Sequence, residues 1–129
     1  MNRRIDEHFA LIESLLVENP AVMAYQVTQR LVGPTDGKLR VKVELTDGGS
    51  AEFFEYVAAG REVRLIKYSF HCQDVTGKLW KRWDNAPHFP QLPNAPHHVH
   101  LADGSVVSAL RPPDIISVLQ ELEEGRTSG

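Results

Sequence analysis

The sequence predicts an α+β fold, in which an antiparallel meander of about five to seven strands is flanked by an N-terminal and a C-terminal helix. Apolar residues recur at helical spacing near both ends of the chain, whereas between residues 22 and 84 they alternate with polar ones. The alternating segments are joined by turns of a few residues, which are too short for the crossovers that parallel strands require. We expect residues 1–129 to form a single domain.

The composition is that of an ordinary globular protein and excludes several classes. Of the 129 residues, 42% are hydrophobic and 24% are charged, so intrinsic disorder is disfavoured. A formal net charge of −3 argues against a globally basic nucleic-acid binder, although it allows a local basic face. The single cysteine, Cys72, cannot form an internal disulfide, and its place in an apolar alternation indicates a core residue. No signal peptide or membrane span is predicted, so we expect a cytoplasmic protein without membrane association.

The first element is an amphipathic helix over residues 3–18. Its apolar stripe follows helical spacing, and Asn19-Pro20 stops it. The stripe consists of Ile5, Phe9, Ile12 and Leu16, with Leu15 beside it. We expect His8, which lies off this stripe, to face solvent.

The meander covers residues 22–84 and is predicted to contain strands at 22–32, 39–45, 51–57, 62–73 and 79–84. In the first strand, Tyr25, Val27 and Leu31 are expected on one face, with Arg30 on the other. The turn at 74–78 predicts that strands 62–73 and 79–84 pair as an antiparallel hairpin.

Alternation within this predicted hairpin assigns its side chains to two faces. The apolar face of strand 62–73 is expected to carry Ile66, Tyr68, Phe70 and Cys72, and the polar face Lys67, Ser69, His71 and Gln73. In strand 79–84 we expect Trp80 and Trp83 on opposite faces, one of them in the core.

Residues 85–107 form a different region, rich in histidine and proline. Prolines recur every three residues from Pro87 to Pro96, which favours an extended loop over residues 85–97. One or two short strands are expected between residues 99 and 107. A second helix is predicted over 113–124 and expected to end at Gly125, with residues 126–129 frayed.

Histidines are the strongest candidates for a functional site, because five of the six lie between His71 and His100. If residues 98–100 are extended, His98 and His100 project to one side and His97 to the other. The pair is compatible with a divalent metal site, for which the third ligand is one of the residues His71, His88 and Asp84. A metal is not required by this pattern, and a carboxylate such as Asp84 also commonly caps a turn or orients a histidine.

A metal-free chemistry fits the same residues. Two histidines that face one phosphodiester act as general base and general acid, and a basic residue such as Lys67 or Arg82 holds the phosphate. This chemistry requires that His71 and at least two of the other clustered histidines share one surface cleft. In a further interpretation, the histidines only form hydrogen bonds.

Three blocks of the sequence resemble the TumE family of toxins from type II toxin–antitoxin modules. The blocks are Tyr-Ser-Phe-His-Cys-Gln at 68–73, Arg-Trp-Asp-Asn-Ala-Pro-His at 82–88 and Pro-His-His-Val-His at 96–100. Two positions depart from the family's pattern: Phe89 stands where a second histidine is common, and Val99 stands where a basic residue is common.

The resemblance implies a toxin that acts with a cognate antitoxin protein, and an RNA-cleaving activity is one that such toxins commonly have. The candidate catalytic residues are then His71, Asp84, His88, His97, His98 and His100, with Lys67 and Arg82 as candidates for nucleic-acid binding. Two other hypotheses stay open, a non-catalytic interaction protein that binds an antitoxin or another macromolecule, and a metal-binding enzyme. The sequence does not determine the oligomeric state.

Overall fold

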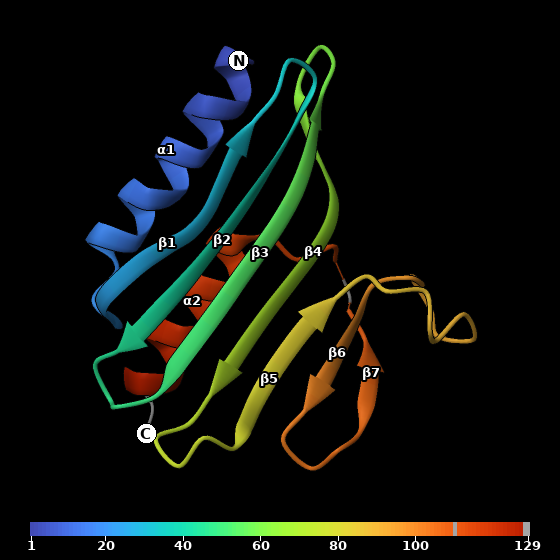
Figure 1. The fold of residues 1–129 in the computed structure, drawn as a ribbon. Helices are drawn as coiled ribbons and strands as arrows, with labels where there is room; N and C mark the ends of the chain where they lie inside the picture. Colours follow the sequence, from blue (N-terminus) through green and yellow to red (C-terminus); the bar gives the residue numbers. More distant parts are fainter. Residues whose placement is uncertain (110, 128–129) are drawn as a thin grey trace.

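The computed structural model describes residues 1–109 and 111–127, and these form two helices and seven strands (Figure 1). The helices are α1 (Arg3–Glu18) and α2 (Ile115–Thr127). The strands are β1 (Val22–Val32), β2 (Asp36–Leu45), β3 (Ser50–Ala59), β4 (Val63–Gln73), β5 (Leu79–Asp84), β6 (His98–Leu101) and β7 (Val106–Ser108). The predicted α+β fold is confirmed.

The strands form one antiparallel meander, because the order in the sheet, β1-β2-β3-β4-β5-β6-β7, is the order in the chain. The predicted hairpin of β4 and β5 is confirmed, with Ser69 opposite Asp84 and His71 opposite Arg82. Its turn is held by Asp74, whose Oδ1 accepts hydrogen bonds from the backbone N–H groups of Thr76 and Lys78. The turn therefore sets which residues of the two strands are neighbours.

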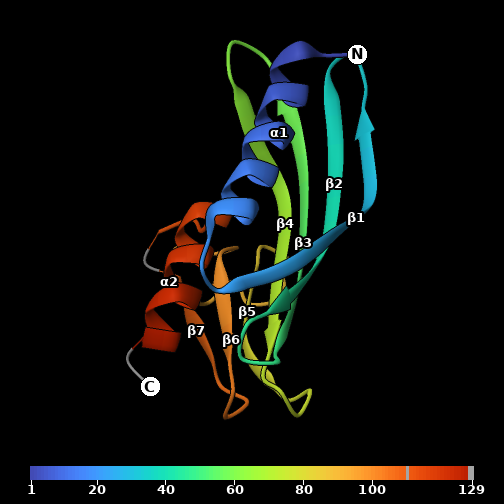
Figure 2. The same ribbon diagram turned by 90° about the vertical axis from the view of Figure 1, so that its left-hand side faces the viewer.

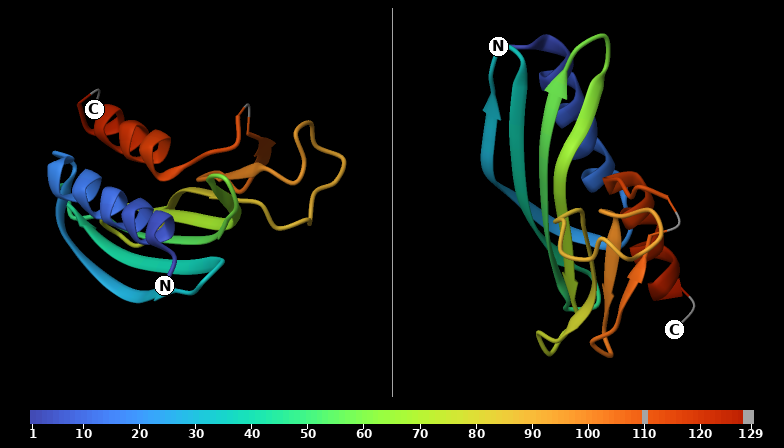
Figure 3. Two further views of the ribbon diagram at one scale, coloured as in Figure 1. Left: turned by 90° about the horizontal axis from the view of Figure 1, so that it is seen from above. Right: turned by 90° about the vertical axis from the view of Figure 1, so that its right-hand side faces the viewer.

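Both helices cover the same face of the sheet and leave the other face open (Figure 2). The predicted stripe of α1 is buried, and strands β1 to β3 bend around this helix when the molecule is viewed from above (Figure 3). The core between the helices and the sheet contains Phe53, Phe70 and Trp83 from the strands and Val118 and Leu122 from α2. Neither of the two helices among the described residues is long and apolar enough to cross a membrane.

The close contact of α1 with β2 depends on Gly37. A Cβ atom at this position would lie 2.8 Å from Cγ2 of Ile5 and 2.8 Å from the backbone oxygen of Leu31. We therefore expect Gly37→Ala to lower the free energy of unfolding by about 1–3 kcal/mol, as overpacking commonly does. Urea denaturation measures the effect. Gly60→Ala is the control, because a Cβ at Gly60 meets no atom within 4 Å among the described residues, and an equal loss in both variants would contradict the close packing.

Two β-bulges overturn parts of the predicted alternation. In β1 the register shifts between Val27 and Gln29, so Arg30 turns toward α1 and its Nη2 lies 2.6 Å from Oδ1 of Asp6. Leu31 is exposed as a result, contrary to the prediction. In β4 a second bulge lies at Ile66, because Tyr56 and Val57 of β3 pair with Lys67 and Leu65 and leave Ile66 without a partner in β3. Ile66 is 43% exposed as a result.

Three further expectations also prove wrong. A register shift at the start of β5 turns Trp80 to the same side as Trp83, and their ring centroids lie 6.2 Å apart. His8 does not simply face solvent, because its Nε2 lies 2.9 Å from Oε1 of the buried Glu55. Helix α2 begins two residues later than predicted and continues through Gly125 to Thr127. Of the four residues expected to be frayed, 128 and 129 lie outside the described residues.

Candidate functional site

The candidate site lies on the open face of the sheet, where antiparallel register brings polar residues of neighbouring strands side by side. One row crosses β4, β5 and β6 as His71, Arg82 and His100. The adjacent row crosses the same strands as Ser69, Asp84 and His98. Strands in a sheet lie about 4.8 Å apart, so each row places three functional side chains within about 10 Å.

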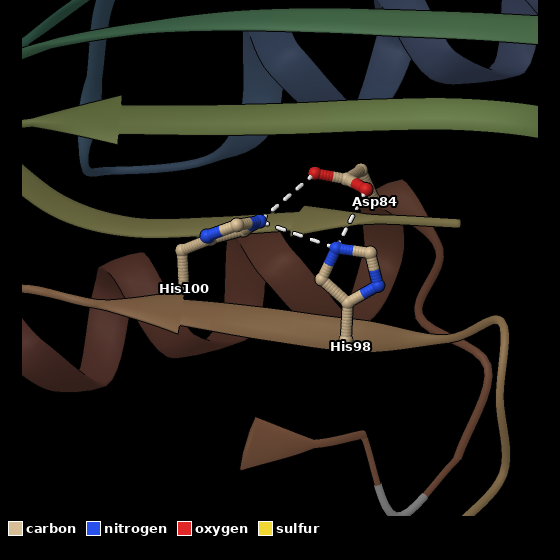
Figure 4. A group of neighbouring side chains, drawn as sticks. All are labelled: Asp84, His98 and His100. Carbon is tan, nitrogen blue, oxygen red and sulfur yellow. Dashed lines mark hydrogen bonds and ion pairs between the residues drawn. The ribbon is translucent and has the colours of Figure 1, made fainter. Parts of the chain in front are cut away.

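Asp84, His98 and His100 converge on one point (Figure 4). Nε2 of His98 lies 2.8 Å from Oδ1 of Asp84, and Nε2 of His100 lies 3.4 Å from Oδ2. The two Nε2 atoms are 3.2 Å apart. We call these three residues the Asp-His-His cluster. It contains a carboxylate and two imidazoles, which are groups that bind divalent metals such as zinc.

Arg82 adds a fixed positive charge to this cluster. Its Nε donates to Oδ2 of Asp84 over 3.1 Å, and its Nη2 donates to Nε2 of His100 over 2.9 Å. Arginine stays protonated and can only donate, so Nε2 of His100 must hold an unprotonated lone pair. The side chain is 38% exposed, which leaves part of the guanidinium available to a ligand on the open face.

The burial of His98 is a feature that the sequence does not predict. Its side chain is 1% exposed, because Phe89 from the proline-rich loop packs on it with ring centroids 4.9 Å apart. Phe89 also contacts the ring of His100. Nδ1 of His98 lies 2.9 Å from the backbone oxygen of Pro96, which fixes the orientation of the ring. Phe89 therefore shields the cluster from solvent.

His71 lies on the other side of Arg82 and is flanked by Glu52 of β3. Burial lowers the pKa of His71, and the charge of Arg82 lowers it further, whereas Glu52 acts in the opposite direction. Burial and the charge of Arg82 also lower the pKa of His100, while Asp84 raises it and His98 lowers it. These shifts favour neutral imidazoles on both sides of Arg82 near pH 7, as a proton acceptor requires.

A groove of about 840 Å³ runs along this face over strands β1 to β5. Its lining includes His71, Arg82 and Asp84 from the two rows. Four basic residues line it, namely Arg40, Lys42, Lys67 and Arg82, against three acidic ones, namely Glu44, Glu52 and Asp84. The groove is thus long and slightly cationic, although the whole chain carries a net negative charge.

The structure separates two candidate histidines from the cluster. His97 projects to the opposite side of β6, as alternation predicts, and its Nδ1 lies 2.7 Å from the hydroxyl of the buried Tyr68. His88 is exposed on the loop that follows β5. The predicted candidates beside Arg82 are therefore His71, Asp84 and His100, and His98 joins them through Asp84 and His100, while Lys67 lies in the groove on β4.

Three residues that surround the candidate site were not identified by the sequence analysis. Phe89 covers the histidines, and Arg40 and Glu52, which are joined by an ion pair of 3.0 Å, extend the polar face across β2 and β3. Arg40 and Glu52 occupy the polar positions of their alternating strands, so the pattern contained a signal for them. Phe89 stands in a loop without periodicity and had no such signal.

Comparison with known proteins gives one match. The family model described as Toxin TumE matches residues 12–125, which include every residue of both rows. No curated protein and no solved structure matches the chain.

Proposed function

Because this chain belongs to the TumE family of toxins, we propose that it is a toxin that cleaves RNA in the groove on the open face of its sheet. The observation that carries this proposal is the row of His71, Arg82 and His100, in which a cation lies between two imidazoles. We further propose that the toxin acts in the cytoplasm and that a cognate antitoxin protein restrains it.

In the proposed reaction, Arg82 holds the scissile phosphate. A guanidinium offers several donors in one plane and suits the oxygens of a phosphodiester. His71 accepts the proton of the ribose 2′-hydroxyl, since burial and Arg82 favour its neutral form. The 2′-oxygen attacks phosphorus to form a 2′,3′-cyclic phosphate, the bond to the 5′-oxygen breaks, and water in the open groove gives the leaving 5′-oxygen its proton beside the Asp-His-His cluster.

The shape and charge of the groove support a single-stranded substrate. The groove crosses five neighbouring strands, which gives room for an extended chain, and its basic residues Arg40, Lys42 and Lys67 lie where further phosphates would pass. Phe54 lies on the same face, with the guanidinium of Arg40 4.5 Å from its ring centroid. Aromatic and guanidinium planes of this kind stack on unpaired bases.

We expect expression of the chain without antitoxin to slow bacterial growth and to fragment cellular RNA. His71→Ala should restore growth and reduce the rate of RNA cleavage by at least about a hundredfold, because loss of one acid–base group costs about 10²–10⁴ in rate. Growth curves and mapping of RNA ends after induction measure both effects. His71 is partly exposed, so this substitution should leave the fold intact.

His88→Ala is the matched control, because His88 is an exposed histidine outside the two rows. Intact RNA in arrested cells would reject the ribonuclease mechanism and favour a toxin that acts by binding. Unimpaired growth with folded, wild-type protein would count against toxicity itself. Equal activity of the His71→Ala and wild-type proteins would remove His71 from the reaction.

A further inference from the structure

We propose that Asp84, His98 and His100 bind a single divalent metal ion of the zinc class. Three protein ligands leave a fourth position for water or a substrate oxygen, which is the arrangement of catalytic rather than structural zinc sites. The binding of the ion is independent of the proposed RNA cleavage. Only the role of the ion in catalysis rests on that function.

The spacing of the ligand atoms fits one ion. Zinc–nitrogen and zinc–oxygen bonds of about 2.0–2.1 Å in a tetrahedron place neighbouring ligand atoms about 3.3 Å apart. The two Nε2 atoms are 3.2 Å apart, and Nε2 of His100 lies 3.4 Å from Oδ2 of Asp84, while Nε2 of His98 lies at the shorter distance of 2.8 Å from Oδ1 of Asp84. All three groups offer atoms within 4.8 Å of one another, so small rotations bring them around one ion.

Hydrogen-bond accounting at the two imidazoles supplies a second argument. The backbone oxygen of Pro96 only accepts, so Nδ1 of His98 carries a hydrogen, and Nε2 is the ring nitrogen of His98 that can bind a metal. Nε2 of His100 carries a lone pair, since Arg82 can only donate to it. The Nε2 atoms of two imidazoles and a carboxylate thus face each other in a mostly buried site. A bound cation satisfies all three.

The surroundings of the ligands are those of a metal site. A ligating histidine commonly donates its other ring N–H to a backbone carbonyl, and His98 does this to Pro96. Asp84 is held in place by the backbone N–H of Ala86, which donates to its Oδ1. Phe89 packs over both imidazole rings and limits access of bulk water.

Arg82 is the group that competes with the ion. Its guanidinium occupies the space beside Oδ2 of Asp84 and Nε2 of His100 and balances part of the negative charge there. An ion bound to these atoms repels the guanidinium, which then swings toward the groove that Arg82 already lines. Metal binding thereby delivers Arg82 to the position where the proposed reaction needs a phosphate ligand.

Under the proposed function, the ion serves the leaving group. A divalent cation beside the scissile bond stabilises negative charge on the leaving 5′-oxygen, and water bound to the ion gives that oxygen its proton. His71 has by then taken the proton of the 2′-hydroxyl, so the proton count balances. The cluster and His71 therefore act on opposite sides of the phosphate.

The test is a titration of untagged protein, stripped with a chelator, with Zn²⁺ by calorimetry, and with Co²⁺ by visible absorption. We expect one ion per chain and cobalt bands typical of a tetrahedral site. Outer-shell partners alone are worth about 10–100-fold in metal affinity. Loss of a ligand in His100→Ala or Asp84→Asn should therefore weaken zinc binding by at least about 100-fold.

Arg82→Gln should have the opposite effect on zinc affinity, because removal of the competing cation should strengthen zinc binding. His88→Ala is the control and should bind zinc like the wild type. Circular dichroism of each variant separates loss of ligands from loss of fold.

Absence of zinc binding in the folded wild-type protein overturns the proposal, as does binding that both ligand variants retain. Zinc binding without RNA cleavage supports the metal site and rejects the ribonuclease, whereas RNA cleavage without zinc binding does the reverse.

Discussion

Phe70→Ala should lower the free energy of unfolding by about 3–5 kcal/mol, the usual cost of truncating a fully buried phenylalanine. Phe70 is 0% exposed and lies in the middle of β4, on the face covered by the helices. Its ring packs edge-to-face on Phe53 and stacks on Tyr68, with centroid distances of 5.9 and 5.1 Å. Truncation leaves a cavity between three strands that paired backbones cannot close. Urea denaturation monitored by tryptophan fluorescence measures the loss.

Ile66→Ala is the matched control on the same strand. Simple alternation places Ile66 and Phe70 on one face, whereas the bulge in β4 leaves Ile66 exposed. We therefore expect Ile66→Ala to change stability by less than about 1 kcal/mol. Similar large losses in the two variants would show that the alternation continues unbroken and that the bulge is misplaced.

The contrast between these two residues explains how far the sequence predicts the fold. Both helices and strands β1 to β5 were predictable because their apolar spacing extends over two or more turns or over several alternations, whereas β6 and β7 are too short for such a pattern. The bulges were not, because a bulge inserts one residue without a change in composition. Each bulge reverses the faces that follow it, which accounts for Leu31, Ile66 and Trp80.

The candidate site follows the same logic. His98 and His100 share a side by alternation alone, and the short turn at Asp74 places His71 opposite Arg82. The partner of the histidine pair was not predictable, because β5 and β6 are separated by residues 85–97, whose length leaves their register undetermined. The pairing of β5 with β6 in the structure is what identifies Asp84, rather than His71 or His88, as the third candidate ligand. His97 was a candidate by proximity in the sequence, although alternation already directed it to the other face.

The burial of the cluster could not be predicted for a different reason. Proline-rich segments lack the periodicity from which a buried face is inferred, so nothing in the sequence placed Phe89 against His98. This contact changes the choice of test variants, since alanine at His98 would remove a fully buried ring. His100 and His71 are the better positions for functional tests because both side chains are partly exposed.

Asp84→Ala should lower the free energy of unfolding by about 3 kcal/mol, the lower end of the cost of breaking a buried ion pair by removing one partner. Asp84 pairs with Arg82, accepts a hydrogen bond from the backbone of Ala86, and has its Oδ1 2.8 Å from Nε2 of the enclosed His98. Alanine leaves the N–H groups of Arg82 and Ala86 without their acceptor in a site where water has little access. The partial exposure of Arg82 reduces the loss, since water solvates the freed guanidinium. Urea denaturation of metal-free protein measures the change.

Asp84→Asn separates the loss of charge from the loss of a hydrogen-bond acceptor, because its amide oxygen can still accept from the backbone N–H of Ala86. We expect Asp84→Asn to be less destabilised than Asp84→Ala, and both to be folded at 25 °C. Zinc at 100 times its dissociation constant should stabilise the wild-type protein by about 2.7 kcal/mol, because a ligand that binds only the folded state adds its binding free energy. Neither variant should gain this increment. Wild-type stability in Asp84→Ala would mean that the carboxylate is not a packed part of the cluster, and an equal zinc increment in all three proteins would place the ion elsewhere.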